Sequence, residues 1–397
     1  MGVPVLSYGT AMSAAEGYSS TTGQRGRART WGRGVGLMRF TLDLSHHPWT
    51  RDRDGQAPRH TLQVAQAADA AGIDAIWASE DPEGWDAFAV LSAIAAVTKR
   101  ADLGPSVTSP YPRHPNLLAA SVATLDRLSG GRAVLGLGRG QAEWHRDALG
   151  SQIGDPLEAL EETVALLRQW WRAPHRASSP EDGHFRVRGW ERVIHPRRGH
   201  VPVYLAAAGP RALDLAGTLC DGAIFNAQTS KDFLRRAIPR VRAAAMAAGR
   251  DPAGLAFVLR TSTVVADSAA AERKAIDRGK NLLALVSTLP GMGRLVQTEG
   301  FDVSALLGEV RETMGTRDTL AAGGGFPALR RDGDLAAARA LIPDDLVRHL
   351  GVIGSLPVVR ERLRALDELG VTHIGVDPPP DATSVESWGR LLADLRD

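Results

Sequence analysis

The 397-residue sequence is poor in cysteine and in aromatic residues, and it contains no long hydrophobic run. Its single cysteine, Cys220, excludes an internal disulfide and argues against a cysteine-based zinc site. The most apolar stretch, residues 87–97, is too short to cross a bilayer. Charged residues make up 23% and hydrophobic residues 44% of the chain, which is a globular composition. We therefore expect a cytoplasmic protein with no membrane partner.

The excess of positive charge is confined to the start of the chain. The formal net charge is +2, but residues 1–37 contain four arginines and one glutamate, so the remainder is almost neutral. This balance gives no argument for a nucleic-acid partner. The first 37 residues are rich in Gly, Ser and Thr and lack the apolar core of a secretory signal. We interpret residues 1–37 as a flexible extension, or as an overlong start assignment with Met38 as the true first residue.

From Met38 onward, short apolar runs alternate with amphipathic stretches of helical period. Eight such pairs predict one (β/α)8 TIM barrel domain over residues 38–397, with a doubly wound open sheet as the alternative. Two stretches break the rhythm, at about 172–200 and 287–350, and we expect both insertions over the carboxyl-terminal mouth of the barrel. The expected strands span residues 40–44, 73–78, 103–108, 133–137, 201–206, 222–226, 255–265 and 371–376.

Two glycine-containing segments follow predicted strands. Residues 134–140 read Val-Leu-Gly-Leu-Gly-Arg-Gly, but the third glycine of a dinucleotide-binding fingerprint falls at Gln141, so that fingerprint fails. Residues 205–211 read Leu-Ala-Ala-Ala-Gly-Pro-Arg and open a helix at Pro210. Each segment has two interpretations. One is a backbone site for an anion such as phosphate; the other is a compact turn between a strand and a helix.

Carboxylates follow the first two strands. Asp43 ends the first strand, and Glu80 and Asp81 follow the second. At a barrel mouth such groups relay protons or orient a substrate, or they form ion pairs with Arg113 or Arg139. The adjacent pair His46 and His47 is weak evidence for a metal, and we expect no metal site.

A proline-rich segment follows the third strand. Residues 103–115 contain four prolines, which fix the backbone just past a strand end, where a barrel places its site. Such rigidity favours a functional loop over a simple connection, although His114 before Pro115 also suits a helix start.

These segments, in this order, resemble the luciferase-like family of flavin- and deazaflavin-dependent oxidoreductases. The similarity runs from about Met38 to Asp397 and is closest to the branch that includes methylenetetrahydromethanopterin reductase. The residues that carry it are Ser79-Glu-Asp81, Val107-Thr-Ser-Pro-Tyr-Pro-Arg-His-Pro115, Ala123-Thr-Leu-Asp-Arg-Leu-Ser-Gly-Gly-Arg132, Leu135-Gly-Leu-Gly-Arg-Gly140, Val201-Pro-Val-Tyr-Leu-Ala-Ala-Ala-Gly-Pro-Arg211 and Leu369-Gly-Val-Thr-His373.

The resemblance implies specific roles for these residues. Ser106 and Val107 match a non-prolyl cis peptide whose bulge, with Thr108 beside it, supports the ring of the cofactor. The segments Gly138-Arg139-Gly140 and Ala208-Gly209-Pro210-Arg211 match those that hold the cofactor's tail and phosphate. Asp43 falls where the reductase branch has a glutamate, and Glu80 and Asp81 are the next catalytic candidates. Asp81 stands where the family often has a histidine, which is a departure from the pattern.

The function that the resemblance implies is hydride transfer between coenzyme F420 (8-hydroxy-5-deazaflavin) and a small organic substrate, by a homodimer. Two alternatives remain at this point. One is an FMN-dependent monooxygenase supplied by a separate flavin reductase. The other is a barrel that binds a deazaflavin without catalysis.

Overall fold

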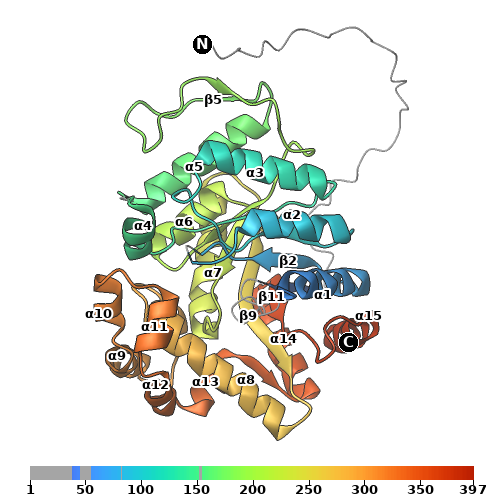
Figure 1. The fold of residues 1–397 in the computed structure, drawn as a ribbon, viewed down its shortest axis with the longest axis vertical. Helices are drawn as coiled ribbons and strands as arrows, with labels where there is room; N and C mark the ends of the chain where they lie inside the picture. Colours follow the sequence, from blue (N-terminus) through green and yellow to red (C-terminus); the bar gives the residue numbers. More distant parts are fainter. Residues whose placement is uncertain (1–37, 45–54, 82, 152–153) are drawn as a thin grey trace, which may run out of the picture. The chain divides into compact units, whose positions relative to one another are not determined.

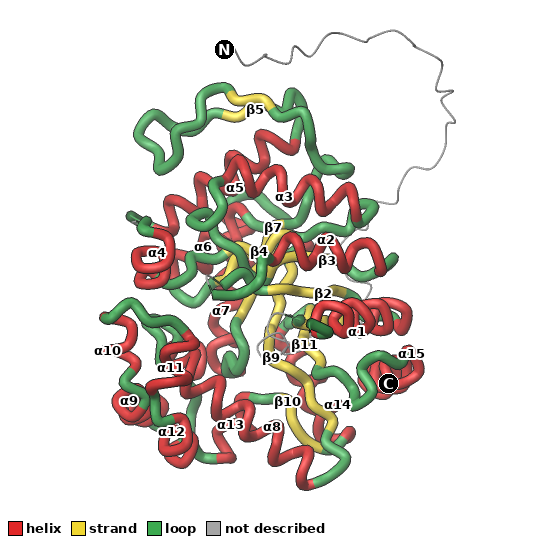
Figure 2. The backbone as a smooth tube through the Cα atoms, in the orientation of Figure 1, coloured by secondary structure: helices red, strands yellow, loops and turns green. Residues whose placement is uncertain are grey.

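The computed structural model describes residues 38–44, 55–81, 83–151 and 154–397. In this part of the chain, eight parallel strands form the barrel at the centre of Figures 1 and 2, in the order β3-β2-β1-β11-β9-β8-β7-β4. Two isolated bridges, Leu103 with Ala133 and Thr108 with Leu137, join β3 to β4 and nearly close the ring. The strands are β1 (Arg39–Asp43), β2 (Ala75–Ala78), β3 (Asp102–Pro105), β4 (Leu135–Leu137), β7 (Val203–Ala206), β8 (Gly222–Phe225), β9 (Ala256–Val265) and β11 (His373–Val376). The (β/α)8 barrel prediction is therefore confirmed.

Helices surround the strands. Three of them begin at a proline, Pro115, Pro156 and Pro210, where the missing N–H costs no hydrogen bond. The helix that follows β1 ends at Gly72, which takes the left-handed conformation common for glycine at helix ends. The barrel helices are α1 (Ala57–Ala71), α2 (Ala87–Val97), α3 (Pro115–Leu128), α4 (Ala142–Leu149), α5 (Pro156–Trp171), α6 (Pro210–Leu219), α7 (Lys231–Ala247), α14 (Leu356–Leu369) and α15 (Val385–Arg396).

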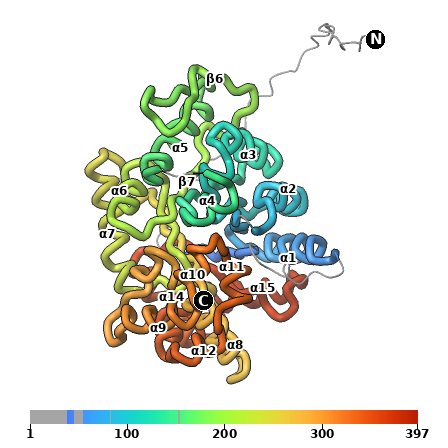
Figure 3. Tube along the Cα trace, turned by 60° about the vertical axis from the view of Figure 1, so that its left-hand side comes forward, coloured from blue at the N-terminus to red at the C-terminus, as the bar shows by residue number. Residues whose placement is uncertain are grey.

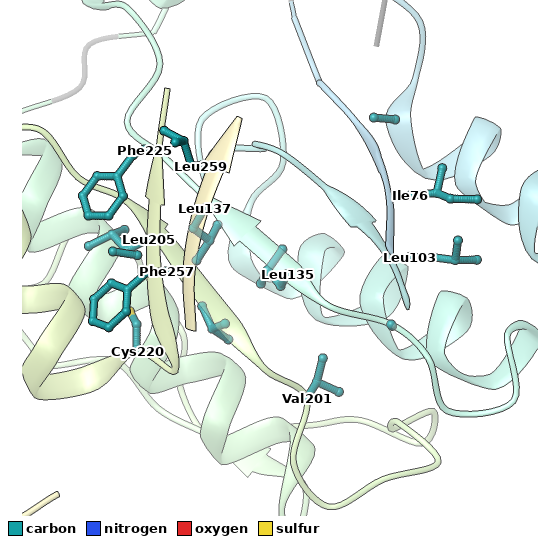
Figure 4. Close-up of a cluster of buried hydrophobic side chains, with 14 of the residues drawn as sticks. Ile76, Leu103, Leu135, Leu137, Val201, Leu205, Cys220, Phe225, Phe257 and Leu259 are labelled. Carbon is teal, nitrogen blue, oxygen red and sulfur yellow. The ribbon is translucent and has the colours of Figure 1, made fainter. Parts of the chain in front are cut away.

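The strands alternate between two buried environments. Outward side chains such as Ile76, Leu205 and Phe257 join the main hydrophobic cluster with the helices (Figure 4). The alternate positions, among them Trp77 and Tyr204, pack against one another in a separate cluster inside the barrel. Burial on both faces explains why the strands are nearly continuous apolar runs in the sequence. Because side chains fill the interior of the barrel, a ligand site is expected outside it, at the carboxyl ends of the strands.

The first insertion does not lie over the carboxyl-terminal mouth, where it was expected. Residues 172–200 contain an antiparallel hairpin of β5 (Arg176–Ala177) and β6 (Trp190–Glu191) that leads into the amino end of β7. Arg198 donates hydrogen bonds to the Asp126 carboxylate and to the Ala133 carbonyl, which lies just before β4. Residues 172–200 therefore contact the amino ends of the strands and not the mouth, because a segment between a helix and the next strand connects at that end.

The second insertion is larger than its expected bounds. It has its own hydrophobic cluster, which includes side chains of α8, whereas the main cluster includes α14. The expected bounds begin at 287, but α14 is the helix that packs on the barrel, so the inserted part begins at α8. The insertion comprises α8 (Ala269–Leu282), a π-helical turn (Leu283–Ser287), a 3-10 turn (Gly293–Val296), α9 (Val303–Thr313), α10 (Thr316–Ala321), α11 (Phe326–Asp332), α12 (Leu335–Leu341), α13 (Asp344–Leu350) and β10 (Val352–Gly354) (Figure 3).

β10 was not predicted. It pairs in parallel with the outer half of β9, from Thr263 to Val265, and so anchors the insertion to the longest strand of the barrel. None of the helices in the described ranges is both long enough and apolar enough to span a membrane.

A buried histidine inside the barrel predicts an acid-sensitive fold. Burial lowers the pKa of His373 to about 3. Because the unfolded chain binds this proton near pH 6.5, the unfolded state carries more protons between pH 3 and 6.5, and stability falls as the pH falls through that range. We expect urea unfolding of His373→Gln at pH 4 to 6 to show a shallower pH dependence than the parent protein. Identical slopes in the two proteins would contradict this assignment.

Candidate active site

A cavity of about 2050 Å³ lies at the carboxyl ends of the barrel strands. It is bounded by residues at or just beyond the ends of β1, β2, β3, β4, β7, β8 and β9 and by part of the second insertion. The structure brings together every site residue proposed from the sequence except Ser106, which is buried beneath the surface of the cavity. The lining includes Asp43, Glu80, Asp81, Val107, Thr108, Gly138, Arg139, Gly140, Ala208, Gly209, Pro210 and Arg211.

The segment after β3 has the backbone that the resemblance implies. The Ser106–Val107 peptide is cis, and the Ser79 hydroxyl donates a hydrogen bond to the Ser106 carbonyl at 3.0 Å. Val107 packs toward Gly138, where an added Cβ would lie 2.7 Å from the Val107 Cγ2 atom. Only glycine fits at Gly138 without displacing Val107, because real Cβ atoms do not approach a methyl group so closely.

Glu80 is held by a network of side chains. The Thr108 hydroxyl donates to one carboxylate oxygen and the Arg113 Nε to the other, at 2.6 Å for the arginine. Arg113 also pairs with Asp86 at 2.6 Å and stacks over Phe88. Burial works against the charge of Arg113, yet the two carboxylates raise its pKa. This network fixes the β2 and β3 loops and occupies both oxygens of Glu80.

Asp43 is also paired, with a residue that the sequence analysis did not propose. Arg260, on β9, donates through Nη2 to the Asp43 carboxylate and, at 3.1 Å, to the Ser79 hydroxyl. The Arg260 Nε is buried and has no acceptor among the described residues. The available signal was one arginine in the middle of β9, directly after four apolar residues. A fixed positive charge therefore lies beside the proposed catalytic carboxylate.

The glycine loop after β4 rests on His145 of α4. The His145 Nε2 lies 3.0 Å from the Arg139 carbonyl, and its ring packs on Tyr111 with centroids 4.7 Å apart. Since a carbonyl only accepts, Nε2 carries the proton, and the buried Nδ1 is an acceptor with no donor among the described residues. Burial lowers the pKa of His145, although the bond to the Arg139 carbonyl opposes that effect. His145 is thus a neutral support for the Gly138–Gly140 loop.

The start of α6 is open to the cavity. Gly209 caps this helix without a side-chain hydrogen bond, so backbone N–H groups of its first turn remain available. Arg211 pairs with Asp155 at 3.0 Å, and both residues line the cavity. From the insertion, the Arg294 Nη1 lies 3.1 Å from the place a Cβ would take at Gly209. The positive end of the α6 dipole and Arg294 together favour an anion here.

His46 and His47 lie outside the described residues, so the structure does not place them. Within the described ranges, no three His, Cys, Asp or Glu side chains gather in a way that could hold a metal ion.

Comparison with known proteins gives matches over most of the chain. The family model described as luciferase-like monooxygenase matches residues 38–373. A 5,10-methylenetetrahydromethanopterin reductase of Methanolobus tindarius is 29% identical, over 79% of this chain and 89% of its own. An F420-dependent hydroxymycolic acid dehydrogenase of Mycobacterium tuberculosis is 31% identical, over 65% of this chain and 70% of its own. The structure of the coenzyme F420-dependent tetrahydromethanopterin reductase of Methanopyrus kandleri aligns with a TM-score of 0.67 at 23% identity, covering 89% of this chain and 97% of that one.

Proposed function

Because the chain belongs to the luciferase-like monooxygenase family, we propose that it is an oxidoreductase that uses coenzyme F420 to exchange hydride with an organic substrate. The proposal rests on relatives that are F420-dependent oxidoreductases and, in this chain, on a cavity that contains the residues needed to hold a deazaflavin. The bound deazaflavin would supply the hydride-accepting or hydride-donating ring carbon.

The observation that carries the proposal is the glycine-lined cradle at the mouth. Gly138 and Gly140 line the cavity, and a side chain at either position would collide with Val107 or His145 respectively. Backbone without side chains at the cavity lining lets a planar ring and its phosphate-bearing tail approach closely. Ser106, Val107 and Thr108 would support the ring, and residues 138–140 and 208–211 would hold the tail.

The protein's own groups would handle the proton. Asp43 lies on the cavity floor in an ion pair with Arg260, so it suits the role of proton acceptor and not that of donor. Glu80, with both oxygens engaged by Thr108 and Arg113, would maintain the loops around the ring. Asp81 lines the cavity beside them and is the remaining catalytic candidate.

The family description names monooxygenases, so an FMN-dependent monooxygenase is the second candidate. Turnover without oxygen separates the two. We expect the protein to change the oxidation state of F420 with an organic substrate under anaerobic conditions, and to form no hydroxylated product when given reduced FMN and oxygen. Oxygen uptake coupled to substrate hydroxylation would favour the monooxygenase.

We also propose that the protein works in the cytoplasm as a homodimer, without a nucleic-acid or membrane partner. Sedimentation equilibrium of the purified protein should give twice the chain mass of 42.3 kDa. A monomer mass at micromolar concentration would overturn the dimer.

A further inference from the structure

A second surface feature lies away from the cavity, on the hairpin between α5 and β7. Three large apolar side chains within five residues face solvent there: Trp190, Val193 and Ile194 are 60%, 90% and 47% exposed. The hairpin lies beyond α3 and α5, at the top of Figure 1. Single exposed apolar residues are normal, but a group of them is typical of a binding surface. We call this group the 190–194 patch.

The backbone that carries the patch is fixed by hydrogen bonds to neighbouring segments. The Trp170 Nε1 donates to the Trp190 carbonyl at 2.9 Å, and the Arg127 Nε donates to the His195 carbonyl at 2.7 Å. Between them, the Arg192 side chain reaches the Asn116 carbonyl of α3 at 2.9 Å. A segment whose conformation is already fixed loses little conformational entropy when it binds a partner, so this rigidity favours a docking role.

Positive charge is concentrated around the patch. Residues 172–200 contain seven arginines and three carboxylates, a formal charge of +4, whereas the rest of residues 38–397 is net negative. Arg172, Arg186 and Arg188 are exposed and have no carboxylate partner in the part of the chain that the structure describes. Unpaired charge of one sign around an apolar centre indicates a partner of the opposite sign.

These features distinguish between the possible occupants. A second copy of this chain that met the surface across a twofold axis would place the +4 hairpin against itself, which is repulsive. A polyanion without apolar surface would pair with the arginines but would leave Val193 and Ile194 uncovered. An acidic protein with an apolar pocket satisfies both the charge and the apolar side chains, and Trp and Arg are the residues enriched at such interfaces.

We propose that the 190–194 patch and the arginines around it bind a partner protein whose contact surface is an apolar pocket ringed by carboxylates. None of residues 172–200, all of which the structure describes, lines the cavity. The hairpin contacts the amino ends of the strands, whereas the cavity lies at their carboxyl ends. The partner therefore leaves the cavity open, and the protein binds it independently of any cofactor.

Photo-crosslinking from the patch tests the surface and identifies the partner. We would place p-benzoylphenylalanine at Val193 of the full chain, in cells that naturally produce it, because a side chain 90% exposed tolerates replacement. The matched control carries the same group at Met246 of α7, which is 58% exposed and outside the hairpin. We expect one acidic protein to be crosslinked from Val193 and not from Met246.

Titration of the purified partner then tests the chemistry. Val193→Glu should weaken its binding at least about tenfold, because a carboxylate replaces a central apolar contact. Arg188→Glu should weaken it about threefold to tenfold, mainly through slower association, and should reduce the salt dependence. Arg317→Glu, the same change at an exposed arginine of α10, should leave the affinity within about twofold of the parent. Unchanged thermal unfolding shows that each variant is folded.

The outcomes decide the proposal without reference to F420. A crosslinked acidic protein whose binding Val193→Glu and Arg188→Glu weaken, and Arg317→Glu does not, supports it. No crosslink specific to Val193, or a crosslink only to a second copy of this chain or to nucleic acid, overturns it. Equal affinities of the purified partner for the parent, Val193→Glu and Arg188→Glu would also overturn it.

Discussion

Asp43→Asn should lower kcat by about a hundredfold to ten-thousandfold, which is the range for loss of a general acid or base. The amide has the shape of the carboxylate and its oxygen can still accept from Arg260, but it cannot accept the substrate proton. Because the change lies on the cavity floor and not in the glycine cradle, F420 affinity should change little. Steady-state kinetics and fluorescence titration of the same preparation measure both quantities.

The matched control is Asp394→Asn. Asp394 also lines the cavity but lies on α15, is exposed, and is remote in the chain from the strand ends that carry the proton-handling group. Its turnover should stay within about twofold of the parent, since isolated surface changes have small effects. Unchanged turnover in Asp43→Asn would remove Asp43 from the mechanism and leave Asp81 as the remaining acidic candidate.

Gly140→Ala should weaken F420 binding by about tenfold to a hundredfold. Gly140 has a φ of +66°, and an added Cβ would lie 2.2 Å from the His145 Nε2. The methyl group must displace the imidazole, which then loses its bond to the Arg139 carbonyl, and the loop that would hold the cofactor's tail changes shape. A combined penalty of about 1–3 kcal/mol corresponds to that loss of affinity.

Gly150→Ala isolates the contact from the backbone penalty. Gly150 ends α4, the helix that contains His145, and has a φ of +63°. An added Cβ at Gly150 would meet nothing within 4 Å. Both variants carry the cost of a left-handed alanine, about 1 kcal/mol, and only Gly140→Ala displaces His145. Equal F420 affinities for the two variants would show that the loop does not contribute to cofactor binding.

The barrel could be predicted because its strands are apolar on both faces and its helices begin at recognisable signals such as Pro115, Pro156 and Pro210. The insertion could not be delimited. α8 has the same amphipathic period as α14, and the sequence does not say whether an apolar stripe packs on the barrel or on a second cluster. The hairpin at 172–200 was misplaced because length and composition do not indicate which end of a barrel a loop occupies.

The site was predicted in part for a similar reason. Asp43, Val107 and Gly138 follow strand ends, and the carboxyl ends of parallel strands meet at one mouth, so position along the chain indicates that they lie together. Their roles came from the family resemblance and stay predictions. Arg260 and His145 could not be assigned roles, because their partners are distant in sequence or are backbone atoms. Arg260 pairs with Asp43 across 217 residues, and His145 bonds to a carbonyl. Such pairings depend on tertiary structure.

The most direct test of the account is a binding titration of the purified protein with F420 and, separately, with FMN. The account predicts saturable quenching of F420 fluorescence with a dissociation constant in the low micromolar range, and no response to FMN at the same concentrations. Binding of FMN alone would contradict the F420 assignment in favour of the monooxygenase. Binding of neither would contradict the cofactor site itself.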